Sequence, residues 1–259
     1  MATQKGALVT VSGNEERDVA GTVAGNQGDD WRRNSRNIVP KGDHLLEHGI
    51  YALHHKDPRA KPFLLLRSQV LNALGHLKGS VLAVTSASAL NGKSHVAANL
   101  ACAISRVRET RLVDLHLRRP VIGDRFGLPQ VEGISSYLEG SNDLGQLSFR
   151  IQDEQLAIHA AGRPTEDSSD LLLSPRLGKL MSKWQDGPDE PICIVDTPPV
   201  LENDDMLLIS KQVDGILFVV EEGRTTRHEM MESFRLLNGT PVIGTILNKS
   251  IAPLAALHG

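Results

Sequence analysis

The stretch TSASALNGKSH, residues 85–95, holds the residue types that could bind phosphate. It ends in Gly92-Lys93-Ser94, the spacing at which backbone N–H groups, an ammonium group and a hydroxyl surround an anion in a phosphate-binding loop. Lys93 would reach the β and γ phosphates of a nucleotide, and Ser94 would offer its hydroxyl to Mg²⁺. Ala87 stands where such a loop usually begins with glycine, so this stretch alone is a weak signal.

Two apolar runs that end in an acid strengthen the signal. The run ICIVDTP, 192–198, has the form of a Walker B element, in which Asp196 would hold Mg²⁺ directly or through water. In RLVDLHLRRP, Asp114 ends a similar run, and Arg118 and Arg119 follow it. The plain alternatives are a turn residue at a strand end for Asp196 and solvated surface charge for the arginines. Beside a phosphate site, however, the arginines could pair with phosphate or carboxylate groups.

These residues need a sheet that brings strand ends together. Apolar runs alternate with helical patterns such as KSHVAANLACAISRV, and we expect strands at 80–86, 110–115, 156–162, 192–198, 215–221 and 241–247. Strands that are apolar throughout and alternate with helices predict a parallel sheet covered on both faces, with ligands at the carboxyl ends of its strands. The predicted fold is therefore a doubly wound α/β domain with a mostly parallel sheet, of the P-loop nucleotide-binding type.

The domain is expected to span residues 59–251. Residues 1–58 are interpreted as a largely disordered N-terminal tail and linker, because most of them are polar and lack apolar periodicity, and residues 252–259 as a short C-terminal tail. The net charge of −3 gives no reason to expect nucleic-acid binding. Cys102 and Cys193 lie in apolar runs and are expected to be buried free thiols. No run suits a membrane span or a signal peptide, so we expect a cytoplasmic location without direct membrane insertion.

Together the motifs resemble the bacterial tyrosine kinases that govern capsule and exopolysaccharide synthesis. The resemblance covers roughly residues 56–249 and follows the order of the family's motifs. The most specific of them are similar to the family's second acidic motif, Asp-x-Asp-Leu-Arg-Arg-Pro, and to its Asp-Thr-Pro-Pro element. The other segments that match are DPRAKPFLLLRSQV, VTSASALNGKSHVAANLACAIS, DLLLSPRLGKLM, VDGILFVVEEGRTT and VIGTILN.

The resemblance implies a kinase that uses ATP and Mg²⁺ to phosphorylate tyrosines. It also implies a partner, the cytoplasmic tail of a membrane chain-length regulator or polysaccharide co-polymerase, which would recruit the chain to the inner face of the membrane. The site residues that follow fall into three overlapping groups: catalytic Lys93, Asp114 and Asp196; metal-binding Ser94, Asp114 and Asp196; and cofactor-binding Asn91, Gly92, Lys93, Ser94, His95, Arg118 and Asn248. Asn248 would contact adenine or, at even odds, only cap a strand end.

The sequence departs from the family pattern at four places. Ala89-Leu90 replaces the Pro-Gly of the loop, and leucine would cost about 1–2 kcal/mol if the backbone at 90 needs a positive φ. His116 replaces the second acid, and imidazole is a poor ligand for Mg²⁺. Lys61, Leu64 and Arg67 stand where the family has Glu-x-x-Arg-x-x-Arg for ring assembly, which leaves homo-oligomerisation open. The tyrosine-rich tail is absent, since the sequence has two tyrosines, Tyr51 and Tyr137.

Three functions therefore stay open. The first is an ATP-dependent tyrosine kinase whose activity Leu90 and His116 would lower. The second is a pseudokinase or scaffold of the polysaccharide machinery. The third, a partition or septum-site positioning ATPase, is disfavoured because Ser88 stands where those proteins carry a second lysine.

Overall fold

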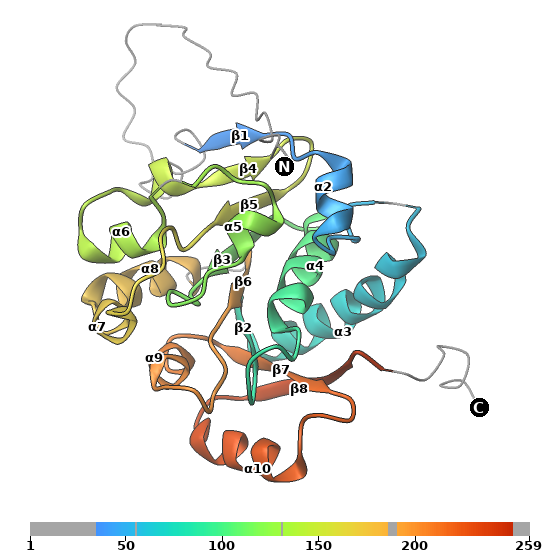
Figure 1. The fold of residues 1–259 in the computed structure, drawn as a ribbon, viewed down its shortest axis with the longest axis vertical. Helices are drawn as coiled ribbons and strands as arrows, with labels where there is room; N and C mark the ends of the chain where they lie inside the picture. Colours follow the sequence, from blue (N-terminus) through green and yellow to red (C-terminus); the bar gives the residue numbers. More distant parts are fainter. Residues whose placement is uncertain (1–34, 55, 131, 186–190, 251–259) are drawn as a thin grey trace, which may run out of the picture.

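The computed structural model describes residues 35–54, 56–130, 132–185 and 191–250, which form a central sheet with helices on both faces (Figure 1). The sheet has the strand order β1-β4-β5-β3-β6-β2-β7-β8, and all pairings are parallel except β4 with β5. The strands are β1 (Arg36–Ile38), β2 (Val81–Ser86), β3 (Thr110–Asp114), β4 (Phe149–Ile151), β5 (Leu156–His159), β6 (Ile192–Asp196), β7 (Gly215–Glu221) and β8 (Val242–Asn248). The predicted fold class is confirmed, and the six predicted strands correspond to β2, β3 and β5–β8.

The helices lie in two layers, with α3 and α4 on one face of the sheet and α6 to α10 on the other (Figure 1). The α-helices are α2 (Gly42–Glu47), α3 (Lys61–Leu77), α4 (Lys93–Ser105), α5 (Ile122–Arg125), α6 (Ile134–Glu139), α7 (Ser168–Leu172), α8 (Pro175–Gln185), α9 (Asp205–Ser210) and α10 (Arg227–Leu236); the 3-10 turns are η1 (Pro58–Ala60) and η2 (Leu144–Leu147). Successive strand residues point to opposite faces. In β2, Leu82 and Val84 therefore join the core under α3 and α4, while Val81 and Ala83 join the core under α8 and α9.

The ordered domain begins earlier than the expected boundary at residue 59. β1 extends the sheet by pairing with β4, and α2 follows it. Ile38, Leu45 and Ile50 are at most 4% exposed and belong to the main core. The strand could not be recognised in the sequence because β1 has three residues, of which only Ile38 is apolar. The rest of the predicted tail, residues 1–34, and the predicted C-terminal tail lie outside the described residues.

One buried amide fastens this N-terminal segment to α4. Asn99 Oδ1 accepts hydrogen bonds from the backbone N–H groups of Tyr51 (2.7 Å) and Ala52 (3.1 Å), and its Nδ2 donates to the carbonyl of Gly49 (2.7 Å). From α5, Arg125 Nη1 donates to the carbonyl of His48 at 2.7 Å. The segment is therefore tied to the two helices that border the loop at 87–92.

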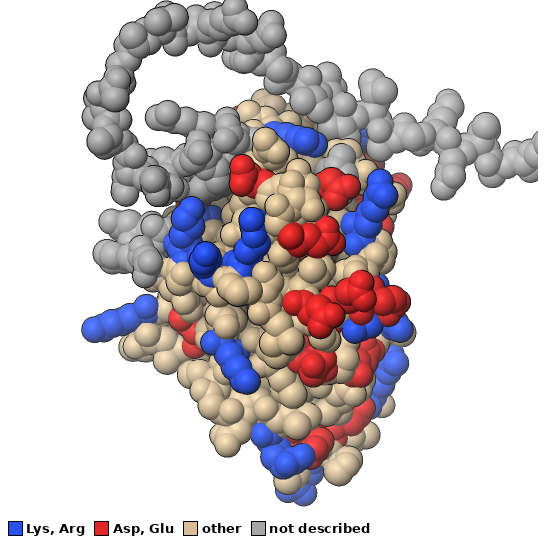
Figure 2. All heavy atoms as spheres, turned by 90° about the vertical axis from the view of Figure 1, so that its left-hand side faces the viewer, with Lys and Arg blue, Asp and Glu red and all other residues tan. Residues whose placement is uncertain are grey.

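The surface charges, the two cysteines and the helix lengths can be compared with what the composition predicts. On the side of the molecule that carries α6 and α7, both acidic and basic side chains are present, so this face does not carry a single sign of charge (Figure 2). Both cysteines are buried and free, as predicted, and burial raises the pKa of the Cys193 thiol to about 12. In the part of the chain that the structure describes, no helix has the length and apolar character needed to cross a membrane.

Replacing Asn99 by alanine should destabilise the chain by about 2–4 kcal/mol, because the variant leaves several buried backbone groups without partners. Urea unfolding of the variant and the parent measures the change. Asn72→Ala, on an exposed position of α3, is the matched control and should stay within about 0.5 kcal/mol of the parent. Equal unfolding midpoints for both variants would contradict the anchoring role.

Candidate functional site

The carboxyl ends of β2, β3 and β6 place four of the predicted residues together. Asp114 and Asp196 are register partners at the ends of the adjacent strands β3 and β6. β2 runs beside β6 and leads through the loop at 87–92 into α4, which begins at Lys93. Lys93 and Ser94 are 6% and 8% exposed and lie close enough to Asp196 to act on its pKa. The strand–loop–helix context that the sequence predicted for a phosphate site is thus present.

The loop turns through left-handed backbone at two positions. Leu90 has φ +67° and Gly92 has φ +88°. A Cβ at residue 92 would collide with the side chain of Asn248, so glycine is required there on steric as well as conformational grounds. Leu90 is 73% exposed and gains little from burial. The condition stated for strain at residue 90 is therefore met.

Side chains from β7, from the turn after it and from the end of β8 clamp this loop. Asn91 is 1% exposed, and its Nδ2 donates to Glu221 Oε2 and Thr225 Oγ1, both at 3.2 Å. Lys249 Nζ donates to the carbonyl of Leu90 at 2.8 Å and to Glu221 Oε1 at 3.0 Å. Asn248 Nδ2 donates to the carbonyl of Asn91 at 2.9 Å. The side chain of Asn91 thus shapes the loop, and its predicted contact with a cofactor stays a prediction.

The two acids differ in how the fold satisfies them. Both are fully buried. Asp114 Oδ1 accepts the N–H of His116 at 3.0 Å, and its Oδ2 accepts those of Val121 and Ile122, both at 3.1 Å. Neither oxygen of Asp196 has a hydrogen-bond partner among the described residues. Burial, followed by repulsion from Asp196, raises the pKa of Asp114 to about 7, and burial also raises that of Asp196 against the attraction of Lys93.

A cleft of about 510 Å³ opens above these groups, and residues from three parts of the chain line it. Its charged and imidazole side chains are those of Lys93, His95, His116, Arg119, Arg125 and Lys249. Burial, together with nearby cations, lowers the pKa of His116 to about 3 and that of His95 to about 4, so both rings are neutral at physiological pH. The cleft holds its positive charge on lysine and arginine alone.

Arg118 lies apart from this cleft. Its Nη1 donates to Glu166 Oε2 at 2.8 Å, and its Nε lies 3.6 Å from Oδ2 of the buried Asp205. Its side chain thus joins the loop at 166 to the start of α9, and the neighbouring Arg119 lines the cleft, while a contact between Arg118 and a cofactor stays a prediction. Sequence reasoning also passed over Arg125, because a helix of four residues carries no periodic pattern that would mark it.

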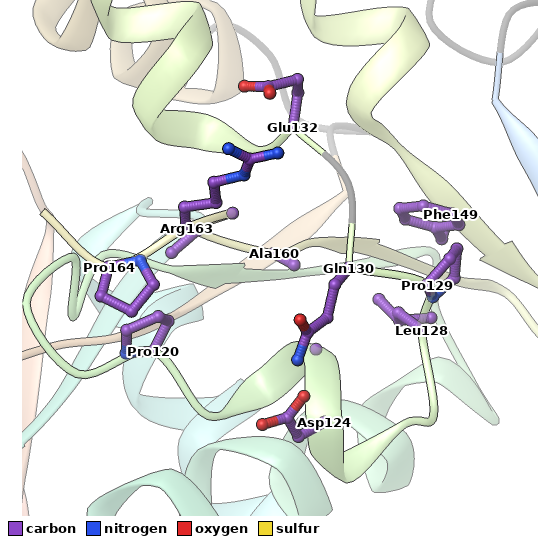
Figure 3. Close-up of a pocket in the computed structure, with 13 residues that line it drawn as sticks. Pro120, Asp124, Leu128, Pro129, Gln130, Glu132, Phe149, Ala160, Arg163 and Pro164 are labelled. Atoms are coloured by element: carbon purple, nitrogen blue, oxygen red, sulfur yellow. The ribbon is translucent and has the colours of Figure 1, made fainter. Parts of the chain in front are cut away.

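A second hollow shares a wall with the cleft. This cavity, of about 150 Å³, lies on the other side of the 116–125 segment. Pro120 and Asp124 face it from that segment, and Phe149 and Arg163 face it from β4 and from the loop after β5 (Figure 3). It is smaller than the roughly 300–1,000 Å³ of ordinary small-molecule sites. The cleft over the loop is therefore the better candidate for a nucleotide.

The residues present fit a nucleotide with Mg²⁺. The loop offers backbone N–H groups at the start of α4, and Lys93 offers a point charge. Asp196 has two buried oxygens without donors, which is the oxygen chemistry that Mg²⁺ prefers. Among the described residues there is no group of three or more His, Cys, Asp and Glu side chains suited to a metal without nucleotide.

Proteins with sequences similar to this chain include tyrosine-protein kinases. No protein-family model matches the chain. It is 28% identical to the tyrosine-protein kinase Wzc of Salmonella typhi over 186 residues, which cover 71% of this chain and 26% of Wzc. It is also 28% identical to the tyrosine-protein kinase CpsD of Streptococcus agalactiae serotype Ia over 190 residues, which cover 70% of this chain and 79% of CpsD. The chain thus spans about a quarter of the length of Wzc and most of CpsD.

Solved structures point to the same fold. The kinase domain of VpsO superposes with a TM-score of 0.67 at 25% identity, covering 74% of this chain and 96% of that domain. The septum-site-determining protein MinD of Pyrococcus horikoshii, solved with Mg-ADP, gives 0.56 at 19% identity, covering 68% and 74%, and shares the fold alone. The chain is therefore related to the bacterial tyrosine-protein kinases, and the resemblance predicted from the sequence is confirmed.

Replacing Leu90 by glycine should stabilise the chain by about 1 kcal/mol, because glycine adopts the left-handed backbone without strain. Thermal and urea unfolding measure the gain. Leu65, 59% exposed in α3, provides the control, since Leu65→Gly should cost about 1 kcal/mol at a helical position. A loss of stability in both variants would show that the loop backbone at 90 is unstrained.

Replacing Asp196 by asparagine should stabilise the chain by about 2 kcal/mol at about pH 8 when divalent cations are chelated. Both acids have folded pKa values above their unfolded ones, so the cost of the charged pair is fully present above a pH of about 7 and fades as the pH falls. The gain should therefore shrink as the pH falls below about 7 and disappear only below about pH 4, near the unfolded pKa of an aspartate. Unfolding measured across this pH range tests the trend, with exposed Asp170→Asn as control; a gain independent of pH would contradict it.

Proposed function

We propose that the chain is an ATP- and Mg²⁺-dependent kinase of the bacterial tyrosine-kinase type, acting in the regulation of exopolysaccharide or capsule polymerisation and export. The observation that carries this proposal is the placement of Lys93 and Ser94, at the start of α4, beside the buried Asp196 with its two donor-free oxygens. This arrangement supplies the phosphate cradle and the metal ligand that phosphoryl transfer needs. The relation to Wzc and CpsD supports tyrosine as the acceptor.

The chain's own residues would divide the work by their surroundings. The N–H groups of the loop and the Lys93 ammonium would hold the phosphates, and Ser94 and Asp196 would hold Mg²⁺, which neutralises phosphate charge when bound. Asp114 already accepts three backbone N–H groups, which hold the 115–122 segment in place. It would therefore act on Mg²⁺ through its negative charge and not as a direct ligand. His95 and Asn248 line the cleft and would contact the nucleotide outside the phosphates.

A nucleotide-binding scaffold without transfer activity is the second candidate. His116 favours it, because a buried neutral imidazole stands where the related kinases have a second acid. Losing one well-placed electrostatic group commonly costs about 10²–10³ in rate. Such a protein would still bind nucleotide, and it would act by docking on a partner and not by phosphorylating tyrosine.

Recruitment by a protein partner completes the proposal. The partner would be the cytoplasmic tail of a chain-length regulator, which would dock near the nucleotide cleft and bring the chain to the inner face of the membrane. A tail that favours the nucleotide-bound form by about 1–3 kcal/mol would act as a switch, and by linkage nucleotide would tighten its docking by the same factor.

Calorimetry and phosphoryl transfer test the proposal together. Mg-ADP should bind the parent and not Lys93→Ala, while Lys211→Ala, on an exposed lysine after α9, should bind like the parent. Radiolabel from ATP should pass to a tyrosine-rich tail peptide, more so with a regulator tail present. If nucleotide binds but no mixture shows phosphoryl transfer, the scaffold is the better explanation. If Lys93→Ala binds nucleotide like the parent, the proposed site is refuted.

A further inference from the structure

The cleft over the loop is unusually one-sided in charge. Four cations, Lys93, Arg119, Arg125 and Lys249, are among the residues that line it, and in the described part of the chain no carboxylate does. The nearby acids Asp114 and Asp196 are fully buried below the cleft. An anion in the cleft therefore meets the positive side chains first, at lower dielectric than in open solvent.

Two of these cations are available to a ligand. Lys249 is occupied by Glu221 and by the carbonyl of Leu90. Arg119 is exposed and forms no ion pair with another described residue. Arg125 is held in place by one bond, from Nη1 to the carbonyl of His48, while its buried Nε has no partner among the residues described. The side chain of Arg125 lines the cleft, and none of the ion pairs among the described residues engages its charge, so it can attract a phosphate group there.

The wall that carries these arginines also carries His116. A carboxylate at position 116 would add an oxygen ligand for Mg²⁺ and a negative charge opposite the arginines. Imidazole supplies neither, since Mg²⁺ prefers oxygen ligands. This wall therefore offers one ligand fewer for Mg²⁺, and its cations are left to contact the phosphates directly.

We propose that Arg119 and Arg125, together with Lys93, form a side-chain clamp on the terminal phosphates, so that the cleft binds ADP or ATP with little dependence on Mg²⁺. This inference rests on the proposed nucleotide site and adds two binding residues and a changed metal requirement. Mg²⁺ can still join the complex through Ser94 and Asp196. Its contribution to affinity is small because the clamp already neutralises much of the phosphate charge.

Calorimetry with ADP in Mg²⁺ and in EDTA, on the full chain, tests the clamp. For the parent, chelation should weaken binding by less than about tenfold, or about 1.4 kcal/mol. In EDTA, Arg119→Gln should weaken binding at least about tenfold, whereas Arg118→Gln, whose side chain lies outside the cleft, should bind like the parent. Arg125→Lys, which keeps the charge and loses the fork, should fall between them. Thermal melts confirm that each variant is folded.

His116→Asp provides the decisive comparison. The added carboxylate should raise the ratio of the EDTA and Mg²⁺ dissociation constants at least about tenfold above that of the parent. Parent binding that requires Mg²⁺, or Arg119→Gln that binds like Arg118→Gln, would overturn the clamp and leave the proposed kinase function intact. A parent that fails to bind ADP even with Mg²⁺ would overturn the nucleotide site itself.

Discussion

The buried pair of Asp114 and Asp196 is the constraint on which the rest of the structure depends. Two carboxylates at matched positions of adjacent parallel strands repel each other and lose their hydration, which raises the pKa of both. The surrounding sheet tolerates this because its strands are buried on both faces by helices. The fold thus keeps an unfavourable arrangement that a bound cation would relieve, as functional sites commonly do.

The loop shows the same relation between stability and use. Leu90 takes a left-handed conformation that glycine would adopt more readily, yet the loop holds that shape. Glu221 and Lys249 fix it from outside, through the side chain of Asn91 and the carbonyl of Leu90. A single strained residue can be held when its neighbours over-determine the backbone around it. Leucine at position 90, where the family has glycine, therefore adds backbone strain to the loop, and the surrounding contacts hold the loop in this conformation.

Much of this could be predicted from the sequence, for reasons that differ by element. β2, β3 and β6 are fully buried apolar runs, and their terminal acids and the Gly92-Lys93-Ser94 turn follow from local pattern. β1 could not be predicted, because three residues carry no periodicity and their pairing with β4 is a tertiary contact. Arg118 and Arg119 are adjacent and identical in type, so only the fold decides which of them faces the cleft. Asn99 gave no local signal, since its partners lie about fifty residues upstream.

Asp114 links these parts into one mechanical unit. Its carboxylate accepts the N–H groups of Val121 and Ile122, which begin α5, and α5 carries Arg125. Arg125 in turn holds the N-terminal segment through His48. The acid that borders the proposed metal site therefore also positions the basic wall of the cleft and, through that wall, the N-terminal segment of the domain. Asp114 holds this wall through backbone N–H groups, and at residue 116 it contacts the backbone and not the side chain. The imidazole of His116 therefore changes the charge of the cleft while these backbone contacts remain.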